Sequence, residues 1–309
     1  YELALSSKLV NVVKYEKLDV LHVHYAVPHA SAAYMAKQIL KDEGLDIPVV
    51  TTLHGTDITL VGKDASYEPV VTFSINKSDS VTAVSESLKQ DTLGHFNIKR
   101  EIDVIPNFID LKKFAKQRMD HFKTAICPNG EFLLIHVSNF RKVKRVQDVL
   151  QVFYGVKQKL PAKLMLVGDG PERAAMEKLC MELGICDDVR FLGKVNEVEE
   201  VLSVADLFLL PSEKESFGLA ALEAMACEVP VVCSDAGGLP EVIQHNKNGM
   251  VNKVGDVDGM VESAVQILGD EEGLHFFKEN ALKRAKEFDI KEVMPLYEAI
   301  YREAIRKTS

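Results

Sequence analysis

The sequence has no tryptophan, and aromatic side chains occupy only 7% of its 309 positions. Its five cysteines contain no Cys-x-x-Cys pair, which disfavours a zinc site or a redox motif. No apolar run reaches the roughly 18 residues that a membrane-spanning helix needs, and the start of the chain does not resemble a signal peptide. We therefore expect a cytoplasmic protein without stable membrane insertion, whose cysteines are reduced core thiols: Cys127, Cys180, Cys186, Cys227 and Cys233.

An excess of basic residues is also missing, because 37 lysines and arginines stand against 46 aspartates and glutamates and leave a net charge of -9. Most nucleic-acid binders carry a basic face, so we expect no nucleic-acid partner. The length of 309 residues and the hydrophobic content of 47% predict two domains, each with its own core. The chain opens with Tyr1 rather than Met, and we expect the first part of the N-terminal domain to be absent from it.

Short apolar segments alternate with helical patterns along most of the chain, which predicts an α/β fold with parallel sheets covered on both faces. In the first third, the expected strands are "DVLHVHY", "IPVVTTLHG", "SVTAVS" and "EIDVIPN". In the second part, they are "EFLLIHVS", "AKLMLVGDG", "DVRFLG", "DLFLLPS" and "PVVCSD".

These patterns predict three regions and a tail. We expect an N-terminal Rossmann-like domain over 1–110, a polar connector over 111–130, and a C-terminal Rossmann-like domain over 131–290. The amphipathic tail from residue 271 is predicted to form two or three helices, broken near Asp289 and Pro295. Its last part, 291–309, is expected to pack back on the first domain.

Polar motifs follow the carboxyl ends of several predicted strands, where open α/β sheets bind ligands. Gly168 and Gly170 in "LVGDGPER" allow a tight turn and a close backbone approach to a ligand, although a plain strand-to-helix turn explains them equally well. Arg173 occupies the place of the third glycine of a dinucleotide motif, so NAD binding is disfavoured. The basic run "SNFRKVKR" over 138–145 follows another strand, and we favour phosphate binding by at least one of its side chains over a solvated helix face.

Three histidines also lie at or near strand ends. His54 is followed by Gly55, and a histidine there can donate a hydrogen bond to a sugar hydroxyl or to a leaving oxygen, while a capping role explains it equally well. His22 and His24 share one face of their strand by the period of two, but no third ligand stands at a plausible spacing. We therefore expect no metal site.

The stretch "PSEKESFGLAALEAMA" places Glu215 and Glu223 on either side of a Ser-Phe-Gly turn. Ser212 and Glu215 have the spacing of a capping box, which is one explanation for the acidic residues. If the helix begins near Gly218 instead, the backbone amides of residues 217–219 form an anion site between the two carboxylates.

The segment "ESFGLAALE" looks like the E-x7-E motif of the family 4 retaining glycosyltransferases, whose fold is called GT-B. "LVGDGPER", "AVSE", "PNFID", "GGLPE" and a lysine after the first strand of the second domain also occur in the family's order. The resemblance covers essentially the whole chain. It implies two Rossmann-like domains whose parallel sheets face each other across a cleft, and a UDP-sugar-dependent hexosyltransferase that retains the α configuration.

Carried over by position, the resemblance implies that Glu223 binds the ribose, Glu215 contacts the transferred sugar and Lys144 meets the diphosphate. It also implies that His54 lies beside the transferring sugar, so Glu215, His54 and Lys144 are the candidate catalytic residues. The candidate ligands of the nucleotide sugar are Glu223, Phe217, Gly218, Leu219, Gly168, Gly170, Asn139 and Arg141.

The chain departs from the family pattern in two places. Ser138 and Asn139 stand where relatives usually carry Gly-Arg, so the usual phosphate arginine is missing and Arg141 is our candidate replacement. Phe108 replaces the common glycine of "PNGID" in the connector.

The segments "HVHYAVPHA" and "LHGTDITLVG" resemble family members that join N-acetylglucosamine from UDP-N-acetylglucosamine to L-malate in bacillithiol biosynthesis. This implies a reaction that needs no cofactor or metal, because Lys144 and helix amides stabilise the leaving UDP. Tyr25 and Thr51, at two strand ends, are the candidate acceptor ligands. Another acceptor such as an inositol phosphate or a lipid, a UDP-sugar epimerase, and a non-catalytic nucleotide-sugar-binding protein remain alternatives. The oligomeric state stays open, a homo-oligomer included.

Overall fold

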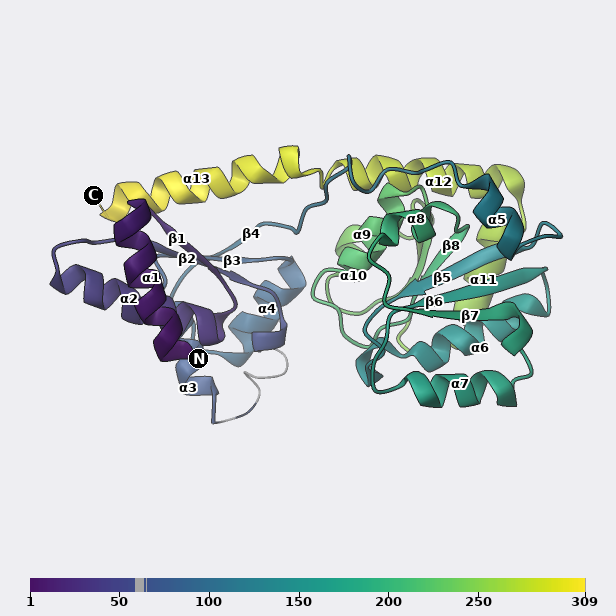
Figure 1. Ribbon diagram of the computed structural model, residues 1–309, viewed down its shortest axis with the longest axis horizontal. Coiled ribbons are helices and arrows are strands. Elements are labelled where there is room, and N and C mark those ends of the chain that lie inside the picture. The colour runs from purple at the N-terminus through teal and green to yellow at the C-terminus, as the bar shows by residue number, and fades with distance from the viewer. Residues whose placement is uncertain (59–63, 65, 309) are drawn as a thin grey trace. The chain divides into compact units, whose positions relative to one another are not determined.

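The computed structural model describes residues 1–58, 64 and 66–308, and the chain divides into two compact units. Unit 1 contains residues 1–107 together with the C-terminal segment from Lys291, and unit 2 contains Phe108–Ile290 (Figure 1). The segment 111–130, which we expected as a connector, is part of unit 2 in this division. Residues 59–62 of the motif "LHGTDITLVG" lie outside the described residues.

Unit 1 is built on a parallel sheet of four strands in the order β1-β2-β3-β4, as the alternating pattern of the sequence predicts. These strands are β1 (Leu21–His24), β2 (Val49–Leu53), β3 (Ser80–Ala83) and β4 (Ile102–Val104). The helical segments of the same unit are α1 (Glu2–Glu16), the turn η1 (Ala26–Ala30), α2 (Ser31–Asp42), α3 (Glu68–Lys77), α4 (Glu86–His95) and the C-terminal α13 (Ile290–Thr308).

The C-terminal helix α13 runs without interruption through Pro295, so the break predicted at this residue is wrong. Proline removes one backbone donor from the helix, which normally weakens it. The helix continues because Val293 and Tyr297 are buried in an apolar cluster of unit 1, and this packing outweighs the lost hydrogen bond. The break predicted near Asp289 is confirmed, because this residue lies between α13 and the helix before it.

Unit 2 is built on a parallel sheet of six strands in the order β10-β9-β8-β5-β6-β7. The first of them along the chain, β5, lies in the middle of the sheet, with β6 on one side and β8 on the other. The strand order therefore reverses between β5 and β8, and ligands of open α/β sheets bind at the carboxyl ends of strands at such a switch point. The strands are β5 (Phe132–Val137), β6 (Ala162–Val167), β7 (Val189–Gly193), β8 (Leu207–Leu210), β9 (Val231–Ser234) and β10 (Gly249–Asn252).

Helices cover the sheet of unit 2 in two groups (Figure 1). One group contains α6, which packs against α7 and α11, and the other contains α9, which packs against α8 and α12. The apolar strands are buried between them, as in β8, where all four residues are buried. The helical segments are α5 (Asp120–Ile126), η3 (Lys142–Lys144), α6 (Val146–Lys157), α7 (Arg173–Glu182), η4 (Cys186–Asp188), α8 (Val198–Ser203), α9 (Leu219–Ala226), α10 (Leu239–Val242), α11 (Val257–Leu268) and α12 (Glu271–Lys286).

The positions of the cysteines agree in most respects with the core thiols that the composition predicts. All five cysteines are free, and four are buried, so the expectation of core thiols fails only at the exposed Cys186.

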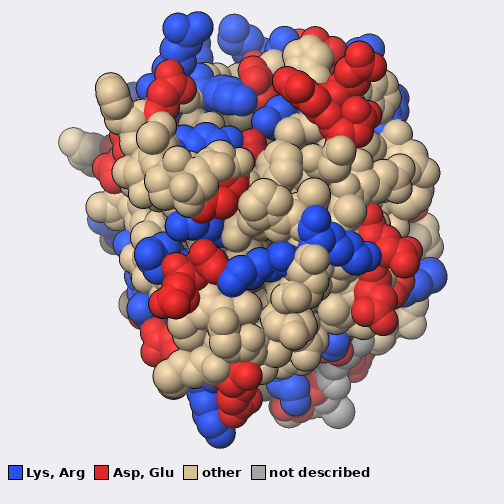
Figure 2. Space-filling model, turned by 90° about the vertical axis from the view of Figure 1, so that its right-hand side faces the viewer, with Lys and Arg blue, Asp and Glu red and all other residues tan. Residues whose placement is uncertain are grey.

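Within the described part of the chain, no helix combines the length and the apolar character that a membrane span needs. Figure 2 shows one face of the molecule, on which lysines and arginines are interspersed with aspartates and glutamates. This face therefore resembles an ordinary solvated surface.

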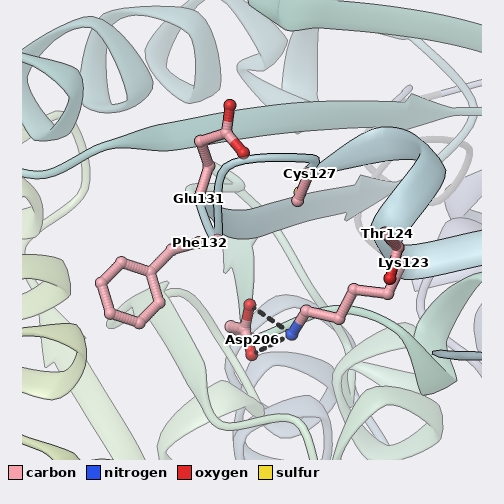
Figure 3. A pocket seen from close by; sticks show the side chains of 7 residues that line it. Lys123, Thr124, Cys127, Glu131, Phe132 and Asp206 are labelled. Carbon is pink, nitrogen blue, oxygen red and sulfur yellow. Dashed lines mark hydrogen bonds and ion pairs between the residues drawn. The ribbon is translucent and has the colours of Figure 1, made fainter.

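A pocket of about 280 Å³ opens at the amino-terminal edge of the unit 2 sheet, next to the starts of β5 and β8 (Figure 3). Asp206 accepts hydrogen bonds there from Lys123 at 2.7 and 2.8 Å, from Lys278 at 3.2 Å and from the Leu133 amide at 3.0 Å. Burial raises the pKa of Asp206, but the two ammonium groups outweigh burial and hold this pKa below its usual range. The pocket lies at the edge opposite to the strand carboxyl ends, so we assign the Asp206 cluster to stability.

Replacing Asp206 by asparagine should lower the free energy of unfolding at pH 7 by about 3 kcal/mol, because two lysines lose the anion that compensates them. The folded pKa of Asp206 is depressed, so its contribution is present above the unfolded pKa of about 4 and is lost as the pH falls through the folded pKa. Urea unfolding of wild type and variant at pH 7 and near pH 3 should therefore give a difference that shrinks in acid.

A matched control is Lys178→Gln, which removes an exposed ion pair with Glu182 on α7. Exposed pairs contribute about 0.5 kcal/mol or less, so this variant should unfold almost as wild type does. Equal effects of the two substitutions would show that Asp206 is not a special stabilising group.

Candidate functional site

The turn between β8 and α9 lies at the switch point of the unit 2 sheet. Gly218 has the left-handed angles φ 97° and ψ 47° and is the N-cap of α9. The helix therefore begins near Gly218, as the alternative to the capping box predicted. The Ser212 hydroxyl donates to the Glu215 carboxylate at 3.0 Å, and among the described residues no side chain caps α9. The capping-box alternative is therefore wrong, because Ser212 and Glu215 pair with each other within the loop.

Lys144 and Glu215 form an ion pair that joins the loops after β5 and β8. Only 22% of the Lys144 side chain and 13% of the Glu215 side chain are exposed. The Glu213 amide also donates to the Val143 carbonyl oxygen at 2.8 Å, so the two loops are held by their backbones as well. Two residues that are 71 positions apart in the chain thus place a cation and an anion at one point of the sheet edge.

Glycines allow neighbouring loops to approach this point closely. Gly237 has φ 54°, and a Cβ atom there would lie 2.0 Å from the carbonyl oxygen of Glu215. Gly168 has φ 123°, and a Cβ atom there would lie 1.8 Å from the carbonyl oxygen of Ser138. Gly170 contacts the backbone of the same loop after β5. The two candidate glycines Gly168 and Gly170 therefore pack the end of β6 against the basic loop, which a side chain would prevent.

The first backbone amides of α9 are available to a ligand. In the described part of the chain, the amides of Phe217, Gly218 and Leu219 have no backbone acceptor. The Phe217 ring is buried and lies edge-on to Phe288 with ring centroids 5.6 Å apart, whereas Leu219 is 42% exposed. The buried ring anchors the turn, so three amides are held at the positive end of a helix, an arrangement that binds anions.

Glu223 lies one turn inside α9 and is partly buried. Burial raises the pKa of Glu223 to about 7, Lys113 opposes this shift, and the nearby Glu199 adds to it. The carboxyl group is therefore close to half protonated near neutral pH. A ligand that donates hydroxyl hydrogen bonds to Glu223 would favour its charged form.

The loop after β5 presents Asn139 and Arg141 on its exposed side. Sequence reasoning missed His136, which supports this loop from beneath: its Nδ1 donates to the Leu209 carbonyl oxygen at 2.8 Å, and its Nε2 accepts from the Ser138 hydroxyl at 2.7 Å. Burial lowers the pKa of His136 to about 4, so the ring is neutral at physiological pH. A histidine inside the apolar run "EFLLIHVS" was the available signal, because a buried polar side chain needs partners.

In unit 1, the ends of β1 and β2 bring His24, Tyr25 and His54 together. His54 Nε2 lies 2.7 Å from His24 Nδ1, and the Tyr25 ring centroid is 5.2 Å from that of His54. Tyr25 has φ 76°, a strained conformation for a residue other than glycine, which is common at functional sites. The structure does not bring Thr51 to this group, because its side chain is fully buried and its hydroxyl hydrogen-bonds that of Ser78 at 2.7 Å. This position disfavours Thr51 as an acceptor ligand.

Sequence reasoning gave no individual role to Asp57 in the motif His-Gly-Thr-Asp, yet this residue organises the loop. Its carboxylate is buried and accepts hydrogen bonds from the amides of Ala26 at 2.7 Å and Gly55 at 3.1 Å. Burial raises the pKa of Asp57, and hydrogen bonds from backbone amides, that of His54 included, oppose the shift. Asp57 therefore ties the loop after β2 to the loop after β1 and fixes the backbone of His54. The sequence did contain a local signal for this role, because an aspartate two residues after a glycine, as Asp57 is after Gly55, often hydrogen-bonds the backbone of a turn.

Each unit thus offers a distinct chemistry at its strand ends. Unit 2 has a lysine, open helix amides and two carboxylates, a set that can hold a phosphate ester beside a polyhydroxylated ring. Unit 1 has His54, whose ring is neutral because burial and the neighbouring His24 lower its pKa to about 4. In the described part of the chain, no three His, Cys, Asp or Glu residues are grouped so that they could hold a metal ion.

Comparison with known proteins adds independent information. Residues 117–284 match the family model for glycosyl transferases group 1, and residues 1–113 match the model for glycosyltransferase family 4. The chain is 48% identical to N-acetyl-alpha-D-glucosaminyl L-malate synthase of Bacillus anthracis, over 99% of this chain and 80% of that protein. It is 27% identical to D-inositol 3-phosphate glycosyltransferase of Mycolicibacterium smegmatis, over 82% and 60% of the two chains. The solved structure of HepE from Anabaena in complex with UDP-glucose aligns with a TM-score of 0.83 at 20% identity, covering 96% of this chain and 81% of that one, and is similar in fold.

Replacing Glu223 by glutamine should stabilise the protein at pH 8 by about 2 kcal/mol, because it removes the cost of holding a charge in a partly buried place. The folded pKa of about 7 lies above the unfolded value near 4.5, so the wild type loses stability as the pH rises from about 4.5 to 7. The gain should therefore vanish at pH 4. Thermal and urea unfolding at pH 8 and pH 4 measure this gain in the free energy of unfolding. Glu213→Gln, at an exposed position, serves as the control. A gain of the same size at both pH values would contradict the raised pKa.

Proposed function

Because the chain belongs to the glycosyl transferases group 1 family, we propose that it transfers N-acetylglucosamine from UDP-N-acetylglucosamine to the hydroxyl group of L-malate, a step of bacillithiol biosynthesis. The observation that carries this proposal is the 48% identity to the Bacillus anthracis L-malate synthase along almost the whole chain. The set of groups at the unit 2 switch point supports the donor side of the reaction, since it suits a nucleoside diphosphate bound to a sugar.

The donor is assigned to unit 2. In this proposal the diphosphate lies against the amides of Phe217, Gly218 and Leu219 and meets Lys144, whose positive charge stabilises the negative charge that develops on the leaving UDP. Glu215, which pairs with Lys144 in the structure, then turns its carboxylate to the hydroxyl groups of the transferred sugar. The loop with Asn139 and Arg141 supplies further polar groups to the phosphates. We expect no metal requirement, because the lysine and the helix amides provide the needed positive charge.

The acceptor side is assigned to unit 1. His54 donates a hydrogen bond to the transferring sugar, and Tyr25 contacts malate. The malate hydroxyl attacks the anomeric carbon from the face that UDP leaves, so the α configuration is retained. The β-phosphate of the leaving group takes the proton of that hydroxyl, which is why no carboxylate pair of the kind used by glycosidases is needed.

Release of UDP from UDP-N-acetylglucosamine only after addition of L-malate tests the substrate assignment directly. Inositol phosphate and a lipid acceptor are the matched alternatives, and the 27% identity to an inositol-phosphate enzyme makes the former a useful comparison. Release with inositol phosphate but not with malate would overturn the acceptor. Conversion of the UDP-sugar without any acceptor would instead identify an epimerase or a hydrolase.

Glu215→Ala should lower kcat by at least 100-fold while UDP still binds, because the variant loses sugar contacts that strengthen during transfer. Turnover with malate and calorimetric binding of UDP measure the two effects. Glu213→Ala, two residues away and exposed, should keep both within about twofold. Normal turnover of the Glu215 variant would refute its assignment.

Glu223→Gln should raise the KM for UDP-N-acetylglucosamine about tenfold at pH 8, because an amide accepts ribose hydroxyls less well than a carboxylate. In the wild type, the same KM should rise as the pH falls below about 7, because the acid form of Glu223 loses acceptor capacity. The variant should show no such rise. A pH-independent KM in the wild type would contradict the ribose role.

A further inference from the structure

Two histidines on one face of β1 have different partners. His22 is held at both ring nitrogens, because Nδ1 lies 2.7 Å from the Tyr301 hydroxyl of α13 and Nε2 lies 2.7 Å from the Thr52 hydroxyl of β2. His24, two residues later, is exposed, and its Nδ1 atom lies 2.7 Å from the Nε2 atom of His54. His22 is therefore part of the packing of unit 1, whereas His24 faces a residue that we place beside the substrate.

The contact between His24 and His54 decides which nitrogen of His54 can face a ligand. Nε2 of His54 is occupied by His24, and in the described part of the chain Nδ1 of His54 has no partner. A neutral imidazole has one donor and one acceptor nitrogen, and the hydrogen bond made by one nitrogen determines the role of the other. If His24 donates, Nε2 of His54 is the acceptor and Nδ1 of His54 carries the hydrogen.

We propose that His24 is a positioning residue for the transfer reaction, which donates from Nδ1 to Nε2 of His54 and so makes Nδ1 of His54 a hydrogen-bond donor to the substrate. This inference rests on the proposed function, because His54 needs a donor nitrogen to bind a hydroxyl or leaving oxygen of the sugar. Asp57 separately fixes the backbone of His54. His24 therefore determines the tautomer of the His54 ring, whereas Asp57 holds the loop that carries it.

The surroundings keep both rings neutral, as this arrangement requires. Burial first, and then His24, lower the pKa of His54 to about 4. Although His24 is exposed as a residue, its ring is partly buried, and this partial burial and then His29 lower the pKa of His24. The other groups near the pair are His22 on β1, the Tyr25 ring at 5.2 Å from His54, and the carboxylate of Asp57 in the loop after β2. His29 also contacts His24, since its Nδ1 donates to the His24 carbonyl oxygen at 2.5 Å.

The test compares two variants of His24. His24→Leu removes the donor, and kcat should fall about 100-fold while the KM for UDP-N-acetylglucosamine changes less than threefold. In His24→Asn, the amide nitrogen follows Cγ by one bond, as Nδ1 does in histidine, so it can donate to His54, and kcat should stay within about fivefold of wild type. The control is His95→Asn, because His95 is an exposed residue of α4 whose Nδ1 donates to the Asp91 carbonyl oxygen of its own helix.

A second readout does not depend on turnover. In the free protein, ¹⁵N shifts of labelled histidines should show His54 with its hydrogen on Nδ1 in wild type and in His24→Asn, and a mixture of tautomers in His24→Leu. The pKa of His54 should also rise in the leucine variant, because the repulsion between the protonated forms of the two rings, which lowers this pKa, is gone.

The outcomes separate this inference from the proposed function. A wild type that transfers sugar to malate, with a leucine variant of unchanged kcat or unchanged His54 tautomer, would overturn the role of His24. A wild type that shows the expected tautomer but no transfer to malate would overturn the proposed acceptor and leave the positioning of His54 intact. Loss of activity in His24→Leu together with a lowered melting temperature and a normal tautomer would mark a merely structural residue and also refute the inference.

Discussion

The pairing of β5 with β8 is the constraint on which the candidate donor site depends. The register that joins Leu134 to Leu207 and Ile135 to Phe208 brings together two strand ends that are more than seventy residues apart in the chain. Both strands are apolar and buried between helices, so hydrophobic burial supports the pairing. The loops that follow then have to lie side by side, and only there can Lys144 reach Glu215.

Burial also sets the protonation of the polar groups at these edges. The neutral rings of His54 and His136 and the raised pKa of Glu223 have desolvation as their largest cause. Desolvation penalises the charged form of an acid and of a base alike, so it makes the histidines neutral hydrogen-bonding groups and makes the glutamate sensitive to a ligand. The same apolar packing that stabilises the sheets therefore tunes the side chains at their ends.

Most strands and helices could be predicted from the sequence because their apolar period is local information. The exceptions have a common cause in tertiary packing. The strand β10 was not expected, because its sequence "GMVN" is short and gains its place by pairing with β9, where Gly249 lies tightly against Val231. Pro295 was expected to end a helix, and the burial of α13 in unit 1 kept the helix intact.

For the candidate site, the sequence by itself indicated which residues follow most of the strand ends and which family the ordered motifs resemble, since each depends on spacing along the chain. It left two possible starts for α9, and it placed Thr51 at a strand end although this residue lies inside β2. Only the tertiary structure decided which of these residues meet. It joined Lys144 to Glu215, placed His136 beneath Ser138 and His24 against His54, and turned Thr51 into the core of unit 1 toward Ser78. The physical reason is that hydrogen bonds, ion pairs and desolvation act between neighbours in space, and neighbours across a parallel sheet come from distant parts of the sequence.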